Sequence, residues 1–293
     1  MSSTGTSVTD RVPAPLLVLV SIASVQTGSA VARTVFDVTG AAGITLLRLF
    51  FAAALLLAVT RPDVRRWSRA QWTPVIALGL SMGAMNLVFY AAIREVPLGV
   101  AVTVEFLGPL LVALAQTRRV VDLLWVVLAG SGVALLGLQD TGDVPLGGLA
   151  LALLAGLFWG GYILASARVG RVLPGVQGLA VALGVSTLLA LPFGASGAAA
   201  AVADGWALLV GAVVALLSSV VPYALELTAL RRLPTRVFGV LMSLEPGAAA
   251  IAGLIVLDQR LGRVELVALL LVSCASVGVT LGRREGQPPT SVD

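Results

Sequence analysis

The chain has 293 residues, of which 58% are hydrophobic and 12% are charged, and its formal net charge is +4. A soluble domain carries about 25% charged residues, so this chain has too few to cover a water-facing surface and is predicted to be an integral membrane protein. It contains no His and one Cys, Cys274, which excludes disulfide frameworks and the usual zinc and haem ligand sets. All 19 basic residues are Arg, which excludes a retinal protein with a lysine Schiff base. The arginines stand in short loops, where they set membrane orientation rather than bind nucleic acid.

The first half of the chain is predicted to cross the membrane five times. Its first apolar segment is expected to be a span rather than a cleaved signal, because another apolar segment follows almost at once. At roughly 20 residues for each span, the predicted helices of this half cover residues 16–32, 41–59, 73–93, 100–116 and 123–138.

The second half begins after a short acidic loop and is predicted to cross the membrane five more times. Its predicted helices cover residues 147–167, 177–195, 206–229, 237–257 and 264–281. Ten spans use about two thirds of the chain, so no soluble domain fits in the remainder.

The two halves repeat with an offset of 137 positions. This offset aligns Pro97 with Pro234 and Pro109 with Pro246. The first pair of prolines encloses Glu105 and the second encloses Glu245. Repeated halves that each carry an acidic, proline-interrupted apolar segment in a matching place are typical of a secondary transporter.

The distribution of arginines predicts the orientation of these halves. With the N-terminus inside, the inner segments hold 14 arginines and the outer segments hold 4, so both termini are predicted to be cytoplasmic. Because five spans is an odd number, the two halves must insert in opposite orientations. The predicted fold is therefore an all-α integral membrane protein with ten transmembrane helices in two inverted five-helix repeats. Residues 1–15 form a cytoplasmic tail, 16–138 the first repeat, 147–282 the second repeat and 283–293 a second cytoplasmic tail.

Three glutamates lie well inside predicted spans: Glu105, Glu226 and Glu245. A carboxylate in the bilayer costs at least about 2.5 kcal/mol, so each needs a reason to be there. An apolar environment favours the protonated form of a carboxyl group, and such a group can exchange protons with a substrate ammonium group. In a structural alternative, a protonated glutamate satisfies the carbonyl that a proline leaves without its donor four residues earlier. The prolines assigned as helix breaks are Pro109, Pro222 and Pro246.

Arg48 is the one basic residue well inside a predicted span. We expect it to pair with a glutamate or to bind a substrate carboxylate; the alternative is that it snorkels to the membrane surface. Asn86 and Tyr90 are four residues apart and share a helix face, and the offset of 137 places Tyr223 opposite Asn86. The further side chains predicted to line a polar cavity with them are Gln26, Trp159 and Tyr162. The alternative for each is ordinary packing or a place at the membrane interface.

Several stretches resemble the threonine/homoserine exporters, which belong to the EamA-type branch of the drug/metabolite transporter superfamily. They read VPLGVAV at 96–102, EFLGP at 105–109, RRVVD at 118–122, LPTR at 233–236 and MSLEP at 242–246. The resemblance covers residues 16–282 and implies ten helices in two inverted repeats, a plasma-membrane location and efflux of small amino acids. One departure is that Asp258-Gln259 stands where these domains usually have Gly-Glu, which puts the rate or coupling of transport in question.

The resulting hypothesis is a secondary active exporter of small amino acids, threonine-like or homoserine-like, that is coupled to protons and works by alternating access around a midplane site. In this hypothesis the substrate is bound by Arg48 and by the aromatic and amide side chains predicted to line the polar cavity. Glu245 and Glu105 couple protons or hold the ammonium group. No enzymatic activity, cofactor or metal is expected, and the expected partners are the substrate, protons and the lipid bilayer. One chain suffices for a pathway, and a dimer is left open. Export of other amphipathic metabolites or drugs remains an alternative, and a membrane-embedded transferase is a remote one.

Overall fold

The computed structural model describes residues 12–115, 121–138, 145–230 and 232–282, and all regular secondary structure in these ranges is helical. An apolar segment without access to water folds as a helix because each backbone N–H then bonds within its own segment. The expectation of an all-α protein is confirmed for the described residues. Residues 1–11 and 283–293, which the sequence assigns to the two tails, lie outside them.

The helices follow the predicted apolar segments. Those of the first half are α2 (Ala14–Arg33), α3 (Phe36–Thr60), the 3-10 helix η1 (Val64–Arg66), α4 (Arg69–Glu95), α5 (Leu98–Glu105), α6 (Leu107–Ala115) and α7 (Val121–Gly137). Those of the second half are α8 (Leu146–Val172), α9 (Gln177–Asp204), α10 (Trp206–Ala215), the π-helix η2 (Leu216–Val220), α11 (Val221–Leu230), α12 (Thr235–Met242), α13 (Glu245–Leu257) and α14 (Arg263–Gly282).

Eight helical segments are long and apolar enough to cross a membrane, among the residues described. Two of them combine broken helices: Leu98–Ala115 spans α5 and α6, and Val237–Leu257 spans most of α12 and α13. Shorter apolar helices, Leu123–Gly137 and Trp206–Val220, lie where the fifth and eighth spans are predicted. The count of ten spans in inverted repeats stays a prediction.

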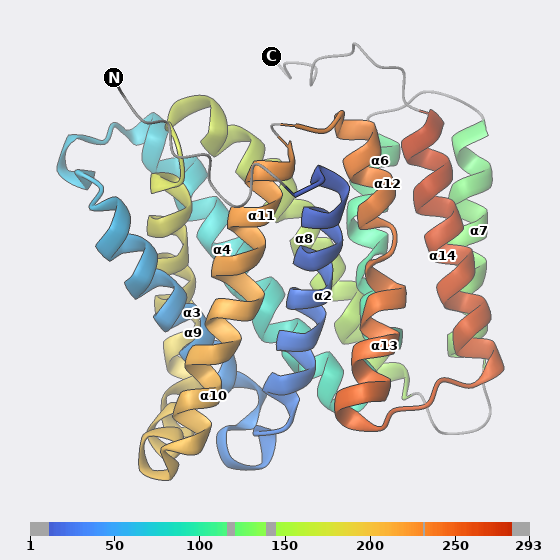
Figure 1. The fold of residues 1–293 in the computed structure, drawn as a ribbon, viewed down its shortest axis with the longest axis horizontal. Helices are drawn as coiled ribbons and strands as arrows, with labels where there is room; N and C mark the ends of the chain where they lie inside the picture. Colours follow the sequence, from blue (N-terminus) through green and yellow to red (C-terminus); the bar gives the residue numbers. More distant parts are fainter. Residues whose placement is uncertain (1–11, 116–120, 139–144, 231, 283–293) are drawn as a thin grey trace.

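The helices form a bundle with two peripheral pairs (Figure 1). α3 packs along α9 at one side and α7 packs along α14 at the other, while α4 and α8 pack together between these pairs. α2 also lies between them and packs on α11 and α13. We call the end of the bundle where α2 begins and α14 finishes the tail end, and the opposite end the far end (Figure 1).

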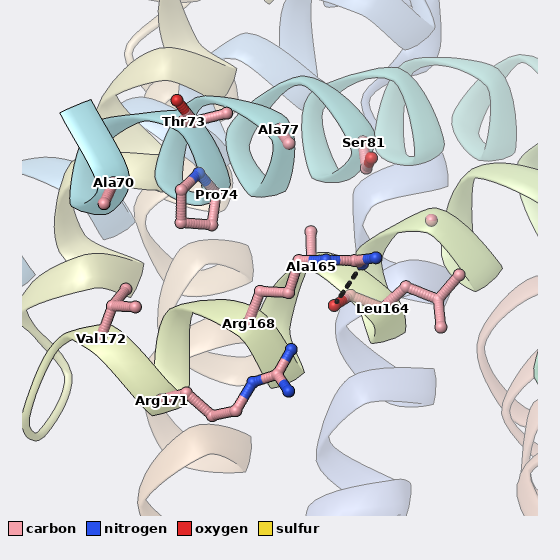
Figure 2. A pocket seen from close by; sticks show the side chains of 11 residues that line it. Ala70, Thr73, Pro74, Ala77, Ser81, Leu164, Ala165, Arg168, Arg171 and Val172 are labelled. Carbon is pink, nitrogen blue, oxygen red and sulfur yellow. Dashed lines mark hydrogen bonds between the residues drawn. The ribbon is translucent and has the colours of Figure 1, made fainter. Parts of the chain in front are cut away.

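α4 and α8 come close at Gly161, and a groove opens between them from there toward the tail end. A Cβ added at Gly161 would lie 3.0 Å from the Ser81 hydroxyl, so only a small residue fits at this contact. Beyond it the two helices leave a groove of about 680 Å³ between them (Figure 2).

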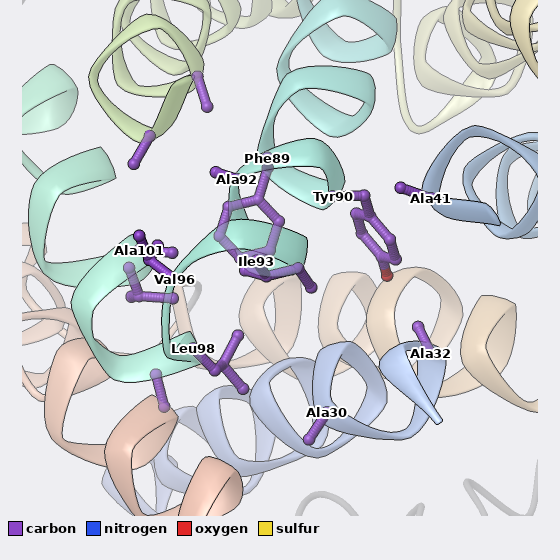
Figure 3. Close-up of a cluster of buried hydrophobic side chains, with 14 of the residues drawn as sticks. Ala30, Ala32, Ala41, Phe89, Tyr90, Ala92, Ile93, Val96, Leu98 and Ala101 are labelled. Atoms are coloured by element: carbon purple, nitrogen blue, oxygen red, sulfur yellow. The ribbon is translucent and has the colours of Figure 1, made fainter. Parts of the chain in front are cut away.

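The largest cluster of buried apolar side chains lies toward the far end, where α4 gives way to α5 (Figure 3). Tyr90, Ile93 and Leu98 are fully buried there, and Ala30 and Ala32 of α2 approach the same cluster. Small residues let helices come close, which is how helices pack in a membrane, where lipid is as apolar as the side chains.

The two helices with the repeated proline spacing are interrupted at equivalent positions. α5 gives way to α6 at Phe106, with φ −63° and ψ −14°. α12 ends at Ser243, with φ −65° and ψ −7°, and α13 follows after Leu244. Phe106 and Ser243 are 137 positions apart and each stands three residues before a proline. The proline withholds its hydrogen bond from the preceding turn, which explains why the helix breaks there.

Candidate functional site

Arg48, in the middle of α3, is held by polar groups from two other helical segments. Its Nη1 donates to Asn86 Oδ1 at 2.7 Å and to the Tyr90 hydroxyl at 3.3 Å. Its Nη2 donates to the backbone carbonyl of Ser218 at 2.9 Å. The guanidinium therefore bridges α3, α4 and η2 inside the bundle rather than reaching for the membrane surface.

The α4 side chains that receive Arg48 are themselves fixed in place. Asn86 donates from Nδ2 to the carbonyl of Met82 at 2.8 Å, which leaves its Oδ1 to accept from Arg48. The Tyr90 ring packs against Phe36 and Phe89, and the Arg48 guanidinium lies 5.7 Å from the centre of the Tyr90 ring. This distance fits a cation–π contact in addition to the hydrogen bond.

Pro222 explains why the Ser218 carbonyl is available to Arg48. A proline leaves the carbonyl four residues earlier without its backbone donor, and here that carbonyl belongs to Ser218. The preceding carbonyl, of Leu217, accepts a hydrogen bond from Ser24 Oγ at 2.6 Å. Side chains from α3 and α2 thus satisfy the backbone around η2. The structural alternative, in which a glutamate satisfies the freed carbonyl, is wrong at this break because Arg48 does so.

Glu105 and Glu245 are both buried, with 7% and 6% of their surface exposed. Glu105 is the last residue of α5 and Glu245 the first residue of α13, so each stands at a helix break. Glu105 is close enough to Arg48 for their charges to interact, and Glu245 is close enough to both Glu105 and Glu226. The side chain of Glu226, on α11, accepts a hydrogen bond from Ser21 Oγ at 2.7 Å.

The remaining predicted side chains are distributed differently. Trp159 packs edge-on against Phe106 at the α5/α6 break, with ring centres 5.5 Å apart. Tyr162, also on α8, packs instead with a separate cluster formed largely by α3, α4 and α9. Tyr223 lies in α11, but its side chain is outside the described part of the structure.

Gln26 is 3% exposed, and its Oε1 has no hydrogen-bond partner among the described residues. It lies one turn after Ile22, which belongs to a cluster with Met242 and Ala248 on either side of the α12/α13 break. The amide is therefore on the face of α2 that faces this break. Arg48 Nε is likewise buried without a partner in the described part of the chain.

Sequence reasoning did not single out Ser21 or Ser24, which bond to Glu226 and Leu217. Hydroxyl residues are common in apolar helices and carry no signal of their own. The Ser218 carbonyl was predicted to lack its donor, because it lies four residues before Pro222, but its partner Arg48 was not predicted.

Asp258-Gln259, which stands where EamA-type domains usually have Gly-Glu, lies at the end of α13. Asp258 ends α13 with φ 52° and ψ 30°, a left-handed conformation that favours glycine, which accounts for the usual Gly. Gln259 Oε1 accepts the backbone N–H of Leu98 at 2.9 Å. The second residue of the pair thus caps the start of α5, the broken helix of the other half.

Comparison with known proteins identifies the family. Residues 146–281 match the EamA-like transporter family. Over 275 residues the chain is 44% identical to the threonine/homoserine exporter RhtA of Salmonella typhimurium strain LT2, covering 93% of each protein. Over 272 residues it is 44% identical to the protein of the same name from Escherichia coli K12, covering 92% of each. The chain belongs to the EamA-like transporters of the drug/metabolite transporter superfamily.

A solved structure described only as the crystal structure of a protein has the same fold as this EamA-like transporter. It superposes with a TM-score of 0.61, is 15% identical, and the match covers 92% of this chain and 99% of that one. The apolar helices and the bacterial relatives together indicate a multi-pass protein of the inner membrane.

Proposed function

We propose that this EamA-like transporter is a secondary active exporter of small neutral amino acids of the threonine and homoserine kind, coupled to protons. The names of its 44%-identical relatives support the substrate class. The observation that carries the proposal is the interior site, in which a fixed arginine lies near buried glutamates at two helix breaks.

The atoms without partners in this site complement a zwitterion. An amino acid offers a carboxylate and an ammonium group, and Arg48 Nε is a buried donor on a cation that suits the carboxylate. Gln26 Oε1 is a buried acceptor, and together with Glu105 or Glu245 it suits the ammonium group. Buried polar groups are normally hydrogen-bonded, so two that lack a partner favour a ligand that supplies one.

A two-fold relation between the repeats is supported by which helices touch. The offset pairs α2 with α8, α3 with α9, α4 with the segment from α10 to α11, α5/α6 with α12/α13, and α7 with α14. α4 packs on α8, and its counterpart α11 packs on α2. α5 and α6 pack on α8, and their counterparts α12 and α13 pack on α2. These contacts keep their kind when the two halves are exchanged, which supports the predicted repeats 16–138 and 147–282.

Alternating access is supported by a helix contact that is present at the far end of the bundle and has no equivalent among the described residues when the two halves are exchanged. α5 packs on α13, where Gln259 bonds to the Leu98 N–H and Gly99 lies against Ala250. The equivalent contact at the tail end would join α12 to α6, but in the described part of the chain these two helices pack on other neighbours. A pathway closed at the far end and less tightly packed at the tail end is one of the two states such a transporter needs.

The orientation completes the proposal. The excess of arginine in the tail-end loops favours a cytoplasmic tail end, with both termini inside the cell. The less tightly packed end then faces the cytoplasm, from which an exporter takes its substrate. One chain contains the whole site.

Counterflow of threonine in proteoliposomes tests the proposal. We expect Glu105→Gln and Glu245→Gln each to reduce exchange of labelled threonine or its response to a pH gradient. Glu95→Gln is the matched control, because Glu95 is exposed at the end of α4. If both buried variants keep the counterflow and pH response of the unaltered protein, the assigned roles are wrong. Competition by homoserine but not by bulky amphipathic compounds supports the substrate class, and the reverse result would favour a drug exporter.

A further inference from the structure

The groove between α4 and α8 lies away from the interior site and opens on a different surface. Its walls carry mainly small or apolar side chains, including Ala70 and Ala77 of α4 and Leu164 and Ala165 of α8 (Figure 2). None of the residues that face Arg48 and the glutamates lines it.

The surroundings of the groove identify the surface on which it opens. Large apolar side chains next to it are exposed on both helices: Ile76 and Leu80 on α4, and Leu157 and Leu164 on α8. In a membrane protein such a surface faces lipid hydrocarbon, because exposing its apolar side chains to water would be unfavourable.

The half of the groove nearer the tail end carries two arginines. Arg168 and Arg171 line it from the last turns of α8 and are exposed, and no acidic residue is among the lining residues (Figure 2). Arg168 Nη1 donates to the carbonyl of Leu164 at 3.3 Å, which directs the guanidinium along the groove wall.

The length of the groove fits one leaflet. It runs along α4 from Ala70 to Ser81, which at 1.5 Å per residue is about 16 Å. Half of a hydrocarbon core of roughly 30 Å is about 15 Å. Gly161 and Ser81 close one end of the groove, apolar walls follow, and the two arginines start from the half nearer the tail end, which is the order of an acyl chain and its phosphate.

We propose that this groove binds one anionic phospholipid, with an acyl chain between α4 and α8 and the headgroup phosphate on Arg168 and Arg171. Basic pockets between transmembrane helices attract anionic headgroups, and arginine binds phosphate through paired N–H groups. The ligand class is thus a lipid of the leaflet at the tail end rather than the transported amino acid. The site does not depend on which substrate the protein exports.

Native mass spectrometry of the full-length protein with added palmitoyl-oleoyl-phosphatidylglycerol tests this assignment. Two arginines near the surface contribute about thirty-fold to anionic lipid affinity, so Arg168→Gln with Arg171→Gln is expected to weaken binding about thirty-fold. Arg65→Gln with Arg66→Gln is the matched control, since both residues are exposed in η1 and neither lines the groove. Equal loss in the control pair would overturn the site in favour of general surface charge.

Two further arms separate a lipid from a soluble anion. Ala77→Trp fills the groove and keeps both arginines, and because Ala77 is exposed the fold should tolerate it. We expect this variant, checked for an unchanged melting temperature, to lose bound phosphatidylglycerol. We also expect glycerol 3-phosphate at equal concentration not to displace the lipid. Retention of the lipid by Ala77→Trp, or its displacement by glycerol 3-phosphate, would contradict an acyl chain in the groove.

Discussion

The two broken helices have nearly the same backbone and very different surroundings. Phe106 and Ser243 differ by 2° in φ and 7° in ψ. The first break is packed against α8, where Gly108 lies directly on the carbonyl of Gly156. The second break is held by a hydroxyl pair, Ser243 and Ser276, whose oxygens are 2.7 Å apart. The proline spacing therefore sets the shape of the break, while the neighbours decide how tightly it is held and what its glutamate meets.

The largest difference is expected from adding one methyl group beside each break. A Cβ at Gly108 would collide with the backbone carbonyl of Gly156, whereas a Cβ at Gly247 would meet nothing within 4 Å. We expect Gly108→Ala to cost about 3 kcal/mol of stability, because a backbone atom cannot move aside as a side chain can. Gly247→Ala should be neutral or slightly stabilising, since alanine favours helix.

Melting temperature and monodispersity of the two purified variants measure this difference. If both variants melt together, the two breaks are held equally, and the contrast between a packed break and a hydroxyl-held break is lost.

The two glutamates should differ in which property of transport they control. Glu105 interacts with the charge of Arg48, and Glu245 with the two other glutamates. Under the proposed function, Glu105→Gln removes the carboxyl group that holds the substrate ammonium. A charge-assisted hydrogen bond contributes about 1.5–3 kcal/mol, so the apparent KM for threonine should rise about ten-fold to a hundred-fold.

Glu245→Gln should instead abolish stimulation by a pH gradient while changing the KM less, because it removes a proton-accepting group from a cluster of carboxyls. Initial rates in proteoliposomes, with and without a pH gradient and over a range of threonine concentrations, measure both. The same change in KM and pH response for the two variants would mean that the breaks have equivalent roles.

The sequence predicted those features that depend on local chemistry. The apolar segments predicted the helices, Pro109 and Pro246 predicted the two breaks, and the four-residue spacing of Asn86 and Tyr90 put both on the face that meets Arg48. At Pro222 the helix instead continues through the π-helix η2. Contacts between helices that are far apart in the sequence could not be predicted from local patterns. Trp159 and Tyr162 are three residues apart on α8 yet join different clusters, because the neighbours of each turn depend on how the helices cross. The hydrogen bond from the Leu98 N–H to Gln259 joins the two halves, and no local sequence pattern predicts it.

That bond is where the two broken helices meet, and removing it should have a moderate effect. Gln259→Ala leaves the first N–H of α5 without its acceptor, and α5 has no capping side chain of its own. An unsatisfied buried donor costs about 1–3 kcal/mol, so we expect a loss near the lower value because the site is only partly buried. Gln259→Glu keeps an acceptor oxygen at this place and should stay close to the unaltered protein. Thermal unfolding of both variants decides the point, and equal loss in both would show that packing rather than the cap joins the two halves.

The smallest effect concerns the residue before Gln259, which ends the second broken helix. Asp258 has φ 52°, and an L-residue pays about 1–2 kcal/mol in the left-handed region, although Asp tolerates it better than most. Asp258→Gly removes this strain but raises the entropy of the unfolded chain, so the net gain should be about 0.5 kcal/mol. Asp258→Ala keeps the strain without the polar side chain and should lose stability. Arg61, at φ 42° after α3, offers a matched position where Arg61→Gly should gain a similar amount. Should Asp258→Gly lower the melting temperature while Arg61→Gly raises it, the Asp258 side chain contributes to the junction of the two broken helices beyond its backbone conformation.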